Sequence, residues 1–416
     1  MLRRRKGLTK VTLKFDNGSM YIKRTISRVL LQACRQFPAV LVTGPRQSGK
    51  TTLLQEELGP LGYAFVSFDD PVVREFAQED PNGFLDGFKD KALVLDEVQY
   101  VPKLFSYLKM RIDAHRARHG RFILTGSQQF QMMNNVSDSL AGRIAVLELL
   151  PFALEELSDR VAPTAAEQIW RGGYPPVVLN PEARELWLRS YLSTYLERDV
   201  RQLQNIRDLA QFQSFITLCA AAHGQEVNLA RLSRQCGISQ PCARQWLGVL
   251  TASYIVQLTP PYHNRLGKRV IKSPKLYFLD SALAAELTRQ PSADALWTGP
   301  MGGAFFEGWV VTETIKFQKA RAGRADIYFW RSHDGLEVDL IIESGGRMHA
   351  IEIKQTATPS SHHTATLRRF RDLAGSSATQ SLVLACSVRE PTRLADRVEA
   401  IPWHAWPHWM QENLLE

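Results

Sequence analysis

The chain has 416 residues, which is too long for one ordinary hydrophobic core and predicts two or three domains. Hydrophobic residues make up 44% of the chain and charged residues 22%, a composition typical of soluble globular proteins. The net charge of +9 and the isoelectric point near 9.3 fit a polyanionic partner, but such values are too common to identify one.

Membrane, secreted and zinc-binding classes find no support in the sequence. No apolar run approaches the roughly 20 residues of a membrane-spanning helix, and no apolar segment of signal-peptide type follows the basic start Arg3–Lys6. The five cysteines are dispersed, and no pair has the spacing of a zinc site. We therefore predict reduced thiols, a cytoplasmic location and no membrane partner. Residues 1–19 are left out of the predicted fold, since a clear helical pattern begins only at Met20.

The first half of the chain alternates short apolar runs with polar stretches of helical periodicity. Apolar runs of this kind predict the strands of a parallel sheet that helices cover on both faces, which is an α/β fold. The predicted strands are Ala39–Thr43, Ala64–Phe68, Ala92–Asp96, Phe122–Thr125 and Ile144–Leu147.

A complete phosphate-binding loop spans Gly44–Thr51, between the first predicted strand and a helix-forming segment. Its glycines allow the backbone to wrap around phosphates, and the N-terminus of the following helix directs N–H groups at them. We expect Lys50 to reach the β- and γ-phosphates of ATP and the Thr51 hydroxyl to bind Mg²⁺. The residues predicted to contact the nucleotide are Gly44, Pro45, Arg46, Gln47, Ser48, Gly49, Lys50, Thr51, Thr52 and Ser127.

Polar residues follow the later strands of the predicted sheet. Asp96 ends an apolar strand, where a second magnesium-binding element is expected, and Glu97 is placed to polarise the attacking water. By itself this pair also fits a strand that ends in a solvated acidic turn. The segment Thr125–Gln128, which contains Ser127, can orient the water or sense the γ-phosphate. Arg143 is a candidate charge-stabilising arginine, acting within the chain or across a subunit interface, or else an ordinary surface charge.

Residues from about 20 to 150 resemble the AAA-type ATPases of the family that carries a C-terminal domain of unknown function numbered 4143. The matching segments are the phosphate loop, Leu95–Gln99, Leu124–Ser127, Leu140–Arg143, Leu149–Phe152, Arg171–Pro175 and Tyr195–Val200. The resemblance covers most of the chain beyond residue 20. It implies a homo-oligomer, such as a hexameric ring.

The sequence divides into four predicted parts, an ATPase core (20–151), a helical segment (152–204), a winged-helix-like domain (205–290) and a C-terminal domain (302–416). In the third part, Gly237 interrupts two apolar helical patterns and Ser239 can cap the second, as in a helix-turn-helix. A strand at Ile255–Leu258 and a wing at 264–275 follow. The wing's cations favour contact with DNA phosphates, and packing within the ATPase is the alternative. These cations are Arg265, Lys268, Arg269, Lys272 and Lys275.

Three acids and a lysine stand out in the C-terminal part. Glu307 lies on a predicted helix, Asp339 lies among apolar neighbours on a strand, and Glu352 and Lys354 share one face of another strand. A buried acid needs a partner, so we expect a shared metal ion or an ion pair. The predicted elements are a helix at Ala304–Lys319, strands at Ile327–Trp330, Glu337–Ile342 and Met348–Ile353, a helix at about His362–Leu373 and a last strand at Ser381–Ala385.

This arrangement is similar to the PD-(D/E)xK nuclease core in its motif and in its order of elements. The resemblance assigns Asp339 and Glu352 to Mg²⁺, Glu307 to the metal shell, and Lys354 to activating the nucleophilic water or holding the phosphate. Val338 replaces the proline that usually precedes the first acid. The alternative is a nuclease fold retained for DNA binding or assembly, without cleavage.

The leading functional prediction is a ring-forming, DNA-dependent ATPase that remodels DNA, as in unwinding by a helicase or branch migration. The second is a nucleotide-gated regulatory or defence protein, whose C-terminal domain is an effector or binds a protein partner. The third is a metal-dependent nuclease with the ATPase as its gate.

Overall fold

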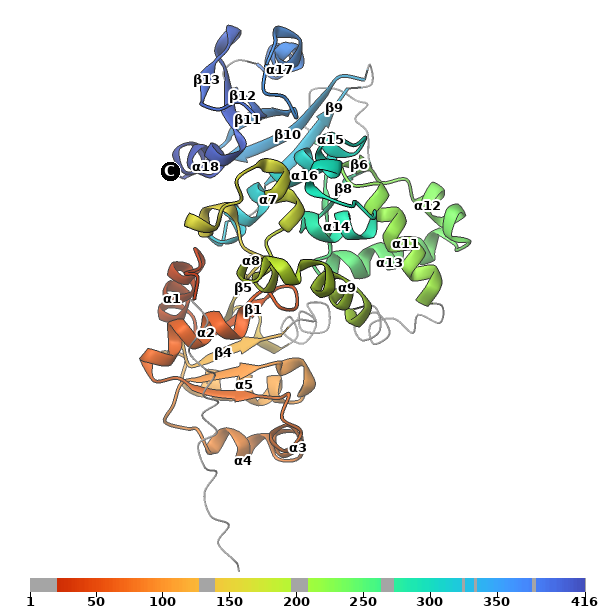
Figure 1. The fold of residues 1–416 in the computed structure, drawn as a ribbon. Helices are drawn as coiled ribbons and strands as arrows, with labels where there is room; N and C mark the ends of the chain where they lie inside the picture. Colours follow the sequence, from red (N-terminus) through yellow and green to blue (C-terminus); the bar gives the residue numbers. More distant parts are fainter. Residues whose placement is uncertain are drawn as a thin grey trace, which may run out of the picture.

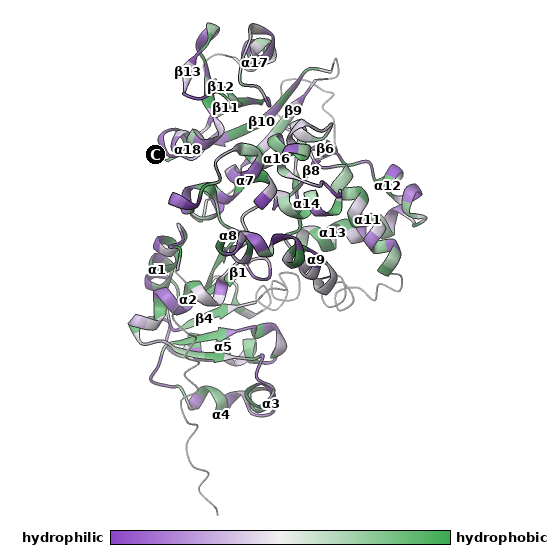
Figure 2. Cartoon of the chain, viewed as in Figure 1, coloured by the Kyte–Doolittle hydropathy of each residue, from purple (hydrophilic) through white to green (hydrophobic). Residues whose placement is uncertain are grey.

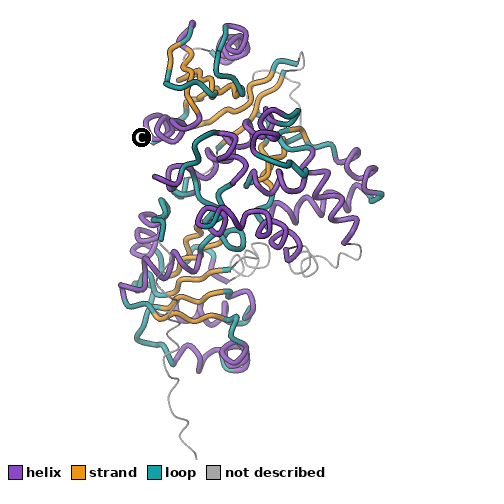
Figure 3. Tube along the Cα trace, viewed as in Figure 1, coloured by secondary structure: helices purple, strands orange, loops and turns teal. Residues whose placement is uncertain are grey.

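The computed structural model describes residues 21–126, 139–195, 209–262, 273–323, 326–332, 335–375 and 379–415. In this part of the chain, a parallel sheet with its helices lies at one end of the molecule, and a mixed sheet lies at the other (Figure 1). A mostly helical middle separates them, as the distribution of strands and helices in Figure 3 shows.

The N-terminal sheet is parallel, with the strand order β2-β3-β4-β1-β5. Along β1, Ala39 and Leu41 belong to one hydrophobic cluster, whereas Val40 and Val42 belong to another. Both faces are therefore buried, and the predicted α/β fold with a parallel sheet is confirmed. The strands are β1 (Ala39–Thr43), β2 (Ala64–Ser67), β3 (Leu93–Asp96), β4 (Phe122–Thr125) and β5 (Ile144–Glu148). The helices are α1 (Ser27–Gln36), α2 (Lys50–Leu58), α3 (Pro71–Glu79), α4 (Pro81–Asp86) and α5 (Leu104–Ala114).

The middle of the chain combines helices with a small sheet of order β6-β8-β7. One hydrophobic cluster includes residues of this middle and of the C-terminal part, so the two share a core. The helices are α7 (Ala165–Arg171), α8 (Pro175–Leu179), α9 (Arg184–Tyr195), α11 (Leu209–Ala221), α12 (Leu229–Cys236), α13 (Gln240–Ala252), α14 (Ser281–Leu287) and α15 (Ala293–Thr298). The strands are β6 (Gln225–Glu226), β7 (Val256–Thr259) and β8 (Lys275–Phe278).

Helices α12 and α13 are joined by a tight turn at the positions that the sequence indicated. Gly237 adopts a φ of 66° at the end of α12, a conformation that glycine reaches without steric cost. The Ser239 hydroxyl accepts a hydrogen bond of 3.3 Å from the backbone N–H of Cys242 at the start of α13. Strand β7 follows α13, so the elements have the order of a helix-turn-helix with a strand after it.

The predicted wing requires a correction at Lys275. This residue begins β8, is only 3% exposed and contacts carboxylates, so it is not a surface cation available to DNA. Its burial among apolar strand residues was not evident from a sequence rich in neighbouring cations. The other four wing cations, Arg265, Lys268, Arg269 and Lys272, lie outside the described residues.

The C-terminal sheet is mixed, with the order β13-β14-β12-β11-β10-β9. Strands β9, β10 and β11 are antiparallel neighbours, and β12 runs parallel to β11. The prediction that Ser381–Ala385 is the last strand is wrong, because β14 continues the sheet parallel to β12. The elements are α16 (Gly302–Lys319), β9 (Ile327–Arg331), β10 (Glu337–Ser344), β11 (Arg347–Ile353), α17 (Ser361–Ala374), β12 (Thr379–Cys386), β13 (Thr392–Arg393), β14 (Val398–Pro402) and α18 (Trp406–Leu414).

Hydropathy follows this architecture. Hydrophobic residues run along the strands of the parallel sheet, and hydrophilic residues are frequent on outer helices such as α12 (Figure 2). Among the described residues, none of the helices has the length and apolar character needed to traverse a bilayer.

Candidate nucleotide site and carboxylate cluster

The phosphate loop lies between the end of β1 and the start of α2. Gly44 has a φ of 144°, and a Cβ atom there would lie 2.1 Å from the carbonyl oxygen of Leu149. Gly49 has a φ of 92° and forms the N-terminal cap of α2. Only glycine fits the first position, because a side chain would collide with backbone that has no room to move.

Lys50 and Thr51 begin α2 and face the interior of the loop. The Lys50 ammonium donates to the carbonyl oxygens of Gly44, at 3.1 Å, and of Pro45, at 2.8 Å. The Thr51 hydroxyl donates to a carboxylate oxygen of Asp96 at 3.0 Å. The structure therefore brings the loop together with the acid that ends β3, from a position 45 residues away.

Two hydroxyl groups donate hydrogen bonds to the Asp96 carboxylate. The Thr125 hydroxyl, from the neighbouring strand β4, donates to its second carboxylate oxygen. Burial raises the pKa of Asp96 above its ordinary value, while the hydrogen bonds from Thr125 and Thr51 act in the opposite direction. Oxygen ligands of this kind, a carboxylate beside a hydroxyl, are those that Mg²⁺ prefers, so Asp96 and Thr51 fit a magnesium site.

Glu97 follows Asp96 in an unusual backbone conformation. Its φ is 54°, and its backbone N–H donates to the Thr125 hydroxyl at 3.4 Å. The Gln99 side-chain amide donates to the Glu97 carboxylate. The left-handed conformation turns the chain sharply after β3, and Gln99 holds the carboxylate of Glu97 in one orientation.

Several residues that support the loop were missed by the sequence analysis. Arg24 is 6% exposed; it pairs with Glu156 at 3.0 Å and donates to the carbonyl oxygens of Ser48 and Leu150. The only available signal was the placement of Arg24 just before the first helix, which is not specific.

The helical middle also contacts the loop. The Trp187 indole N–H donates to the Gln47 side chain at 2.7 Å, and its ring stacks on Tyr191 with centroids 5.0 Å apart. The Tyr254 hydroxyl lies 3.5 Å from the Thr43 hydroxyl at the end of β1. The nucleotide site is therefore bordered by both the ATPase core and the middle of the chain.

The remaining predicted nucleotide contacts differ in exposure. Arg46 is half-buried and Thr52 is exposed, whereas Ser48 is buried. Ser127 lies outside the described residues.

Arg143 lies far from the phosphate loop of its own chain. Its carbonyl oxygen accepts from Ala39 at the start of β1, whereas the loop follows the end of that strand. Five strand residues separate the two edges by roughly 16 Å. The Arg143 guanidinium pairs with both carboxylate oxygens of Asp113, at 2.9 and 3.0 Å. The predicted charge-stabilising role of Arg143 within its own chain is therefore wrong, because Arg143 precedes β5 at the edge of the sheet opposite the loop. Its role across a subunit interface stays a prediction.

The C-terminal acids and lysine come together as the strand pairing requires. Asp339 accepts from the backbone N–H of Ile353 at 2.8 Å and from the Lys354 ammonium at 3.1 Å. Lys354 also contacts one carboxylate oxygen of Glu352 at 2.8 Å. The other oxygen of Glu352 is buried and has no hydrogen-bond partner in the described part of the chain. Burial raises the pKa of Glu352 to about 8, and the nearby Asp339 adds to this effect.

Glu307 makes different contacts from those that the nuclease resemblance implies. Its carboxylate accepts from the Lys275 ammonium at 2.8 Å and from the Tyr277 hydroxyl at 2.6 Å, both on β8. Across the ranges that the structure describes, no group of three or more His, Cys, Asp or Glu side chains is arranged to hold a metal ion. Glu307 therefore lies in an ion pair rather than in a metal shell, because the Lys275 ammonium, from the middle of the chain, binds its carboxylate.

Comparisons with known proteins agree with this architecture. Residues 36–158 match the AAA domain family, 163–294 match the domain of unknown function 8612, and 302–406 match the domain of unknown function 4143. Uncharacterized proteins of Mycobacterium tuberculosis and Mycobacterium bovis are each 34% identical over 342 residues, which cover 81% of this chain and 75% of theirs.

The alignments with solved structures are more distant. The Walker-type ATPase of Pyrococcus abyssi aligns with a TM-score of 0.44 and 15% identity, over 63% of this chain and 94% of that one. The RuvB Holliday junction branch migration motor of Thermotoga maritima aligns with a TM-score of 0.30 and 17% identity, over 56% and 89%. Together, the phosphate loop, the domain matches and the mycobacterial relatives place this chain in the family of P-loop ATPases in which an AAA domain precedes a C-terminal domain of unknown function 4143.

Proposed function

We propose that this chain binds ATP with Mg²⁺ at the phosphate loop and hydrolyses it. The observation that carries this proposal is the contact of 3.0 Å between the Thr51 hydroxyl and Asp96, which joins the loop to the acid at the end of β3. Thr51 and Asp96 would hold the ion, which neutralises charge on the phosphates when it is bound.

The chain's own residues perform the other parts of the reaction. Lys50 exchanges its two backbone carbonyl partners for phosphate oxygens, and the N-terminus of α2 donates N–H groups to the same anion. The Glu97 carboxylate accepts a hydrogen bond from the attacking water and then takes the proton that this water loses. The Gln99 amide keeps the Glu97 carboxylate oriented. Gly44 and Gly49 adopt the positive φ angles that let the loop backbone wrap around the phosphates.

ATP turnover by purified variants tests this proposal. Glu97→Gln should lower kcat by about 100-fold or more with ATP binding retained, since the base is lost but the loop is intact. Lys50→Ala should lower kcat and should also weaken ATP binding, since the ammonium no longer contacts the phosphates. Glu75→Gln is the matched control, because Glu75 is an exposed acid on α3. Turnover by Glu97→Gln at the rate of the control would contradict the assignment.

We further propose that DNA stimulates this ATPase through α12 and α13, in a homo-oligomer such as a hexameric ring that remodels DNA. Gln240, Arg244 and Gln245 are exposed on α13, whereas Ala243 and Trp246 are buried. The second helix of a helix-turn-helix presents such a polar face to the major groove. The net charge of +9 favours the same partner.

The DNA proposal is tested by ATPase rates with duplex, forked and single-stranded DNA. Stimulation should fall as salt rises and should be weaker in Arg244→Ala. Arg118→Ala is the matched control, because Arg118 is an exposed arginine of the ATPase core. Equal rates with and without every DNA form would reject the motor.

The second candidate function is a nucleotide-gated regulatory or defence protein with an effector or protein-binding C-terminal domain. Its support is the engagement of Glu307 by Lys275 and Tyr277, which ties the carboxylate cluster to the middle of the chain. Tight nucleotide binding, slow turnover and co-purification of a partner would favour it over the motor.

A nuclease gated by the ATPase is the third candidate. Asp339→Ala should then abolish DNA cleavage with Mg²⁺ or Mn²⁺ while ATPase activity persists, and an unchanged cleavage rate would reject cleavage at this cluster.

A further inference from the structure

Lys275 is the most deeply placed cation beside the C-terminal carboxylates. Its side chain is 4% exposed, and its ammonium contacts Glu307 at 2.8 Å and Glu337 at a shorter distance. It also lies 5.5 Å from the centre of the Phe329 ring. Lys275 belongs to β8 in the middle of the chain, so this contact joins two separately matched parts of the sequence.

Among the described residues, the carboxylates of this cluster outnumber the cations that contact them. Glu307 and Glu337 contact the Lys275 ammonium, and Asp339 and Glu352 contact the Lys354 ammonium. Arg331 pairs with Glu226 and, at 3.5 Å, with Glu337. One oxygen of Glu352, whose side chain is 8% exposed, is left without a hydrogen-bond partner in the described residues. A buried carboxylate oxygen in this state attracts a further cation.

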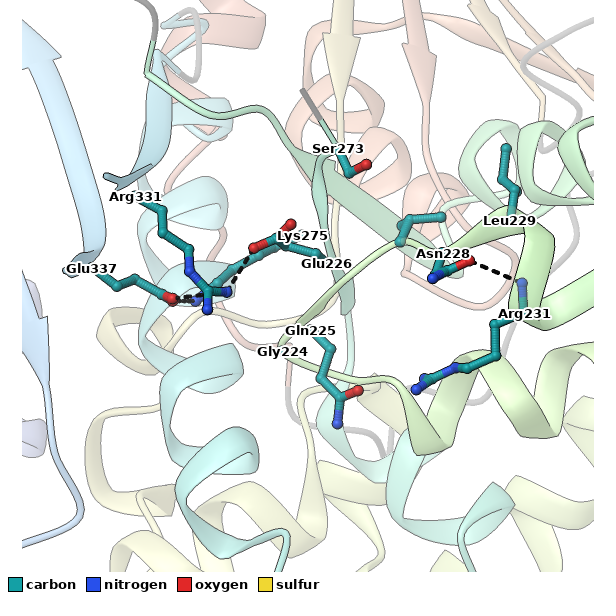
Figure 4. A pocket seen from close by; sticks show the side chains of 11 residues that line it. Gly224, Gln225, Glu226, Asn228, Leu229, Arg231, Ser273, Lys275, Arg331 and Glu337 are labelled. Carbon is teal, nitrogen blue, oxygen red and sulfur yellow. Dashed lines mark hydrogen bonds and ion pairs between the residues drawn. The ribbon is translucent and has the colours of Figure 1, made fainter. Parts of the chain in front are cut away.

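Solvent reaches the Lys275 side of the cluster through an open pocket. The pocket has a volume of about 710 Å³ and is lined by Lys275, Glu337, Arg331 and the start of α12. Figure 4 shows Lys275 extending from β8 to Glu337, with Arg331 between Glu337 and Glu226. The Tyr277 hydroxyl, two residues further along the same strand, holds the same Glu307 oxygen as Lys275.

We propose that Lys275 is the resident cation of this carboxylate cluster and excludes a divalent ion, Mg²⁺ or Mn²⁺, while β8 is docked against α16. Lys275 and Tyr277 hold the Glu307 carboxylate toward β8. Loss of the Lys275 ammonium leaves the Glu307 and Glu337 carboxylates without this cation, so a divalent ion can bind with Asp339 and Glu352. The inference rests on the proposed role of the C-terminal carboxylates and not on ATP turnover.

The proposal differs from a purely structural ion pair in what happens when the lysine is removed. A structural pair that loses its lysine leaves unpaired acids, and no ion takes the vacated place. A cation site that loses its resident lysine instead gains affinity for another cation, because the same oxygens become available as ligands.

Binding of Mn²⁺ to the full chain, without nucleotide or DNA, tests the proposal. All variants carry Asp96→Asn, so the phosphate loop contributes no metal ligand from β3. Lys275→Met should bind one Mn²⁺ about tenfold or more tightly than the parent. Adding Glu352→Gln should remove that gain, and Lys103→Met, at an exposed lysine, should leave the parent's affinity unchanged. Equal affinities of the parent and Lys275→Met would overturn the proposal.

Thermal unfolding keeps the test decisive if Lys275→Met folds poorly. Mn²⁺ should raise its Tm toward that of the parent, since the ion replaces the lost ammonium. Lys275→Met/Glu307→Gln removes the pair together and should gain less from Mn²⁺ than Lys275→Met. An equal gain in both variants would place the ion elsewhere and overturn the proposal. ATPase or cleavage assays that fail would reject the proposed functions without changing these readouts.

Discussion

Arg24 connects three backbone segments around the phosphate loop. It pairs with the buried Glu156 and donates to the carbonyl oxygens of Ser48, at 3.0 Å, and Leu150, at 2.7 Å. Arg24→Met should lower the free energy of unfolding by roughly 3–5 kcal/mol, because Glu156 is left charged and unpaired. ATP affinity should fall as well, since the Ser48 peptide is no longer held. Urea unfolding and nucleotide titration measure the two effects.

The companion variant Arg24→Met/Glu156→Gln separates packing from charge. Without the stranded carboxylate it should be less destabilised than Arg24→Met alone. If the double variant were the less stable of the two, the Arg24–Glu156 pair would not be the source of the effect.

His349 gives the protein a predictable sensitivity to acid. Its Nδ1 lies 2.7 Å from the Ser381 hydroxyl, and burial lowers the pKa of His349 to about 4. The unfolded chain, with an ordinary pKa near 6.5, then binds the proton more tightly than the folded chain. The His349 contribution to stability is therefore complete above about pH 6.5 and is lost progressively as the pH falls toward 4.

The variant His349→Gln tests this dependence, since it keeps a polar partner for Ser381 but does not titrate. Its free energy of unfolding, measured in urea between pH 7 and pH 4, should fall less steeply than that of the wild type, by about one proton. Parallel curves for the two proteins would show that His349 carries none of the acid sensitivity.

At the residue scale, the sequence predicts those site residues whose chemistry is local to a motif. Lys50 and Thr51 follow a glycine pattern, and Asp96 ends a strand, so their meeting follows from parallel strand order. The ion pairs of Arg24 and Lys275 could not be predicted in this way. Their partners Glu156 and Glu307 lie 132 and 32 residues away, and no local sequence pattern indicates either pair.

At the scale of elements, the loop between β1 and α2 depends on its first glycine. Gly44→Ala would place a Cβ atom 2.1 Å from the carbonyl oxygen of Leu149, at a φ of 144°. ATP binding should be lost, since the loop must move away from the end of β5. Gly142→Ala is the matched control, because Gly142 also has a positive φ but no atom of the described residues would lie within 4 Å of the added Cβ. Its cost should be roughly 1 kcal/mol of stability, with ATP binding retained.

Nucleotide titration and thermal unfolding of both glycine variants distinguish the two sources of strain. The prediction fails if Gly44→Ala binds ATP as tightly as Gly142→Ala, since the close approach to Leu149 would then have no consequence.

Elements with a strong burial pattern were predictable, and weakly patterned ones were not. Each strand of the parallel sheet is a short apolar run, and the inner strands β1, β3 and β4 are buried almost throughout, whereas the edge strands β2 and β5 are partly exposed. Strand β14 is Val398–Pro402, with an acid inside and a proline at its end, so five residues gave no clear strand signal. Its pairing with β12 on one side and β13 on the other identifies it as a strand.

At the scale of the molecule, the segment after β5 links the ATPase core to the C-terminal domain. On one side it contacts the loop, through Leu149 beside Gly44 and Leu150 beside Arg24. On the other side it contacts α16 through Phe152 and Leu154, and Glu148 at the end of β5 itself pairs with Lys319 at 3.0 Å. Helix α16 carries Glu307 near its other end, so one helix reaches from this segment to the carboxylate cluster.

The most buried part of that link is the Glu313–Lys316 pair on α16. Glu313 accepts from the backbone N–H of Leu154 at 2.7 Å, and Lys316 donates to the carbonyl oxygen of Phe152 at 3.1 Å. Glu313→Ala strands the Lys316 ammonium and the Leu154 N–H, so it should cost roughly 3–5 kcal/mol. The contacts that are lost join the ATPase core to the C-terminal domain. Calorimetry of Glu313→Ala should therefore show two unfolding transitions that lie further apart in temperature than in the wild type.

A neighbouring ion pair supplies the control for this last prediction. Arg321 binds both carboxylate oxygens of Glu155, at 2.8 and 2.9 Å, but its side chain is 21% exposed. Gln411 still donates to the Glu155 carboxylate at 3.2 Å once the arginine is removed, so Arg321→Met should cost less than Glu313→Ala and leave the spacing of the transitions unchanged. If Arg321→Met separated the transitions as far as Glu313→Ala, the Arg321–Glu155 pair rather than the Glu313–Lys316 pair would couple the ATPase core to α16.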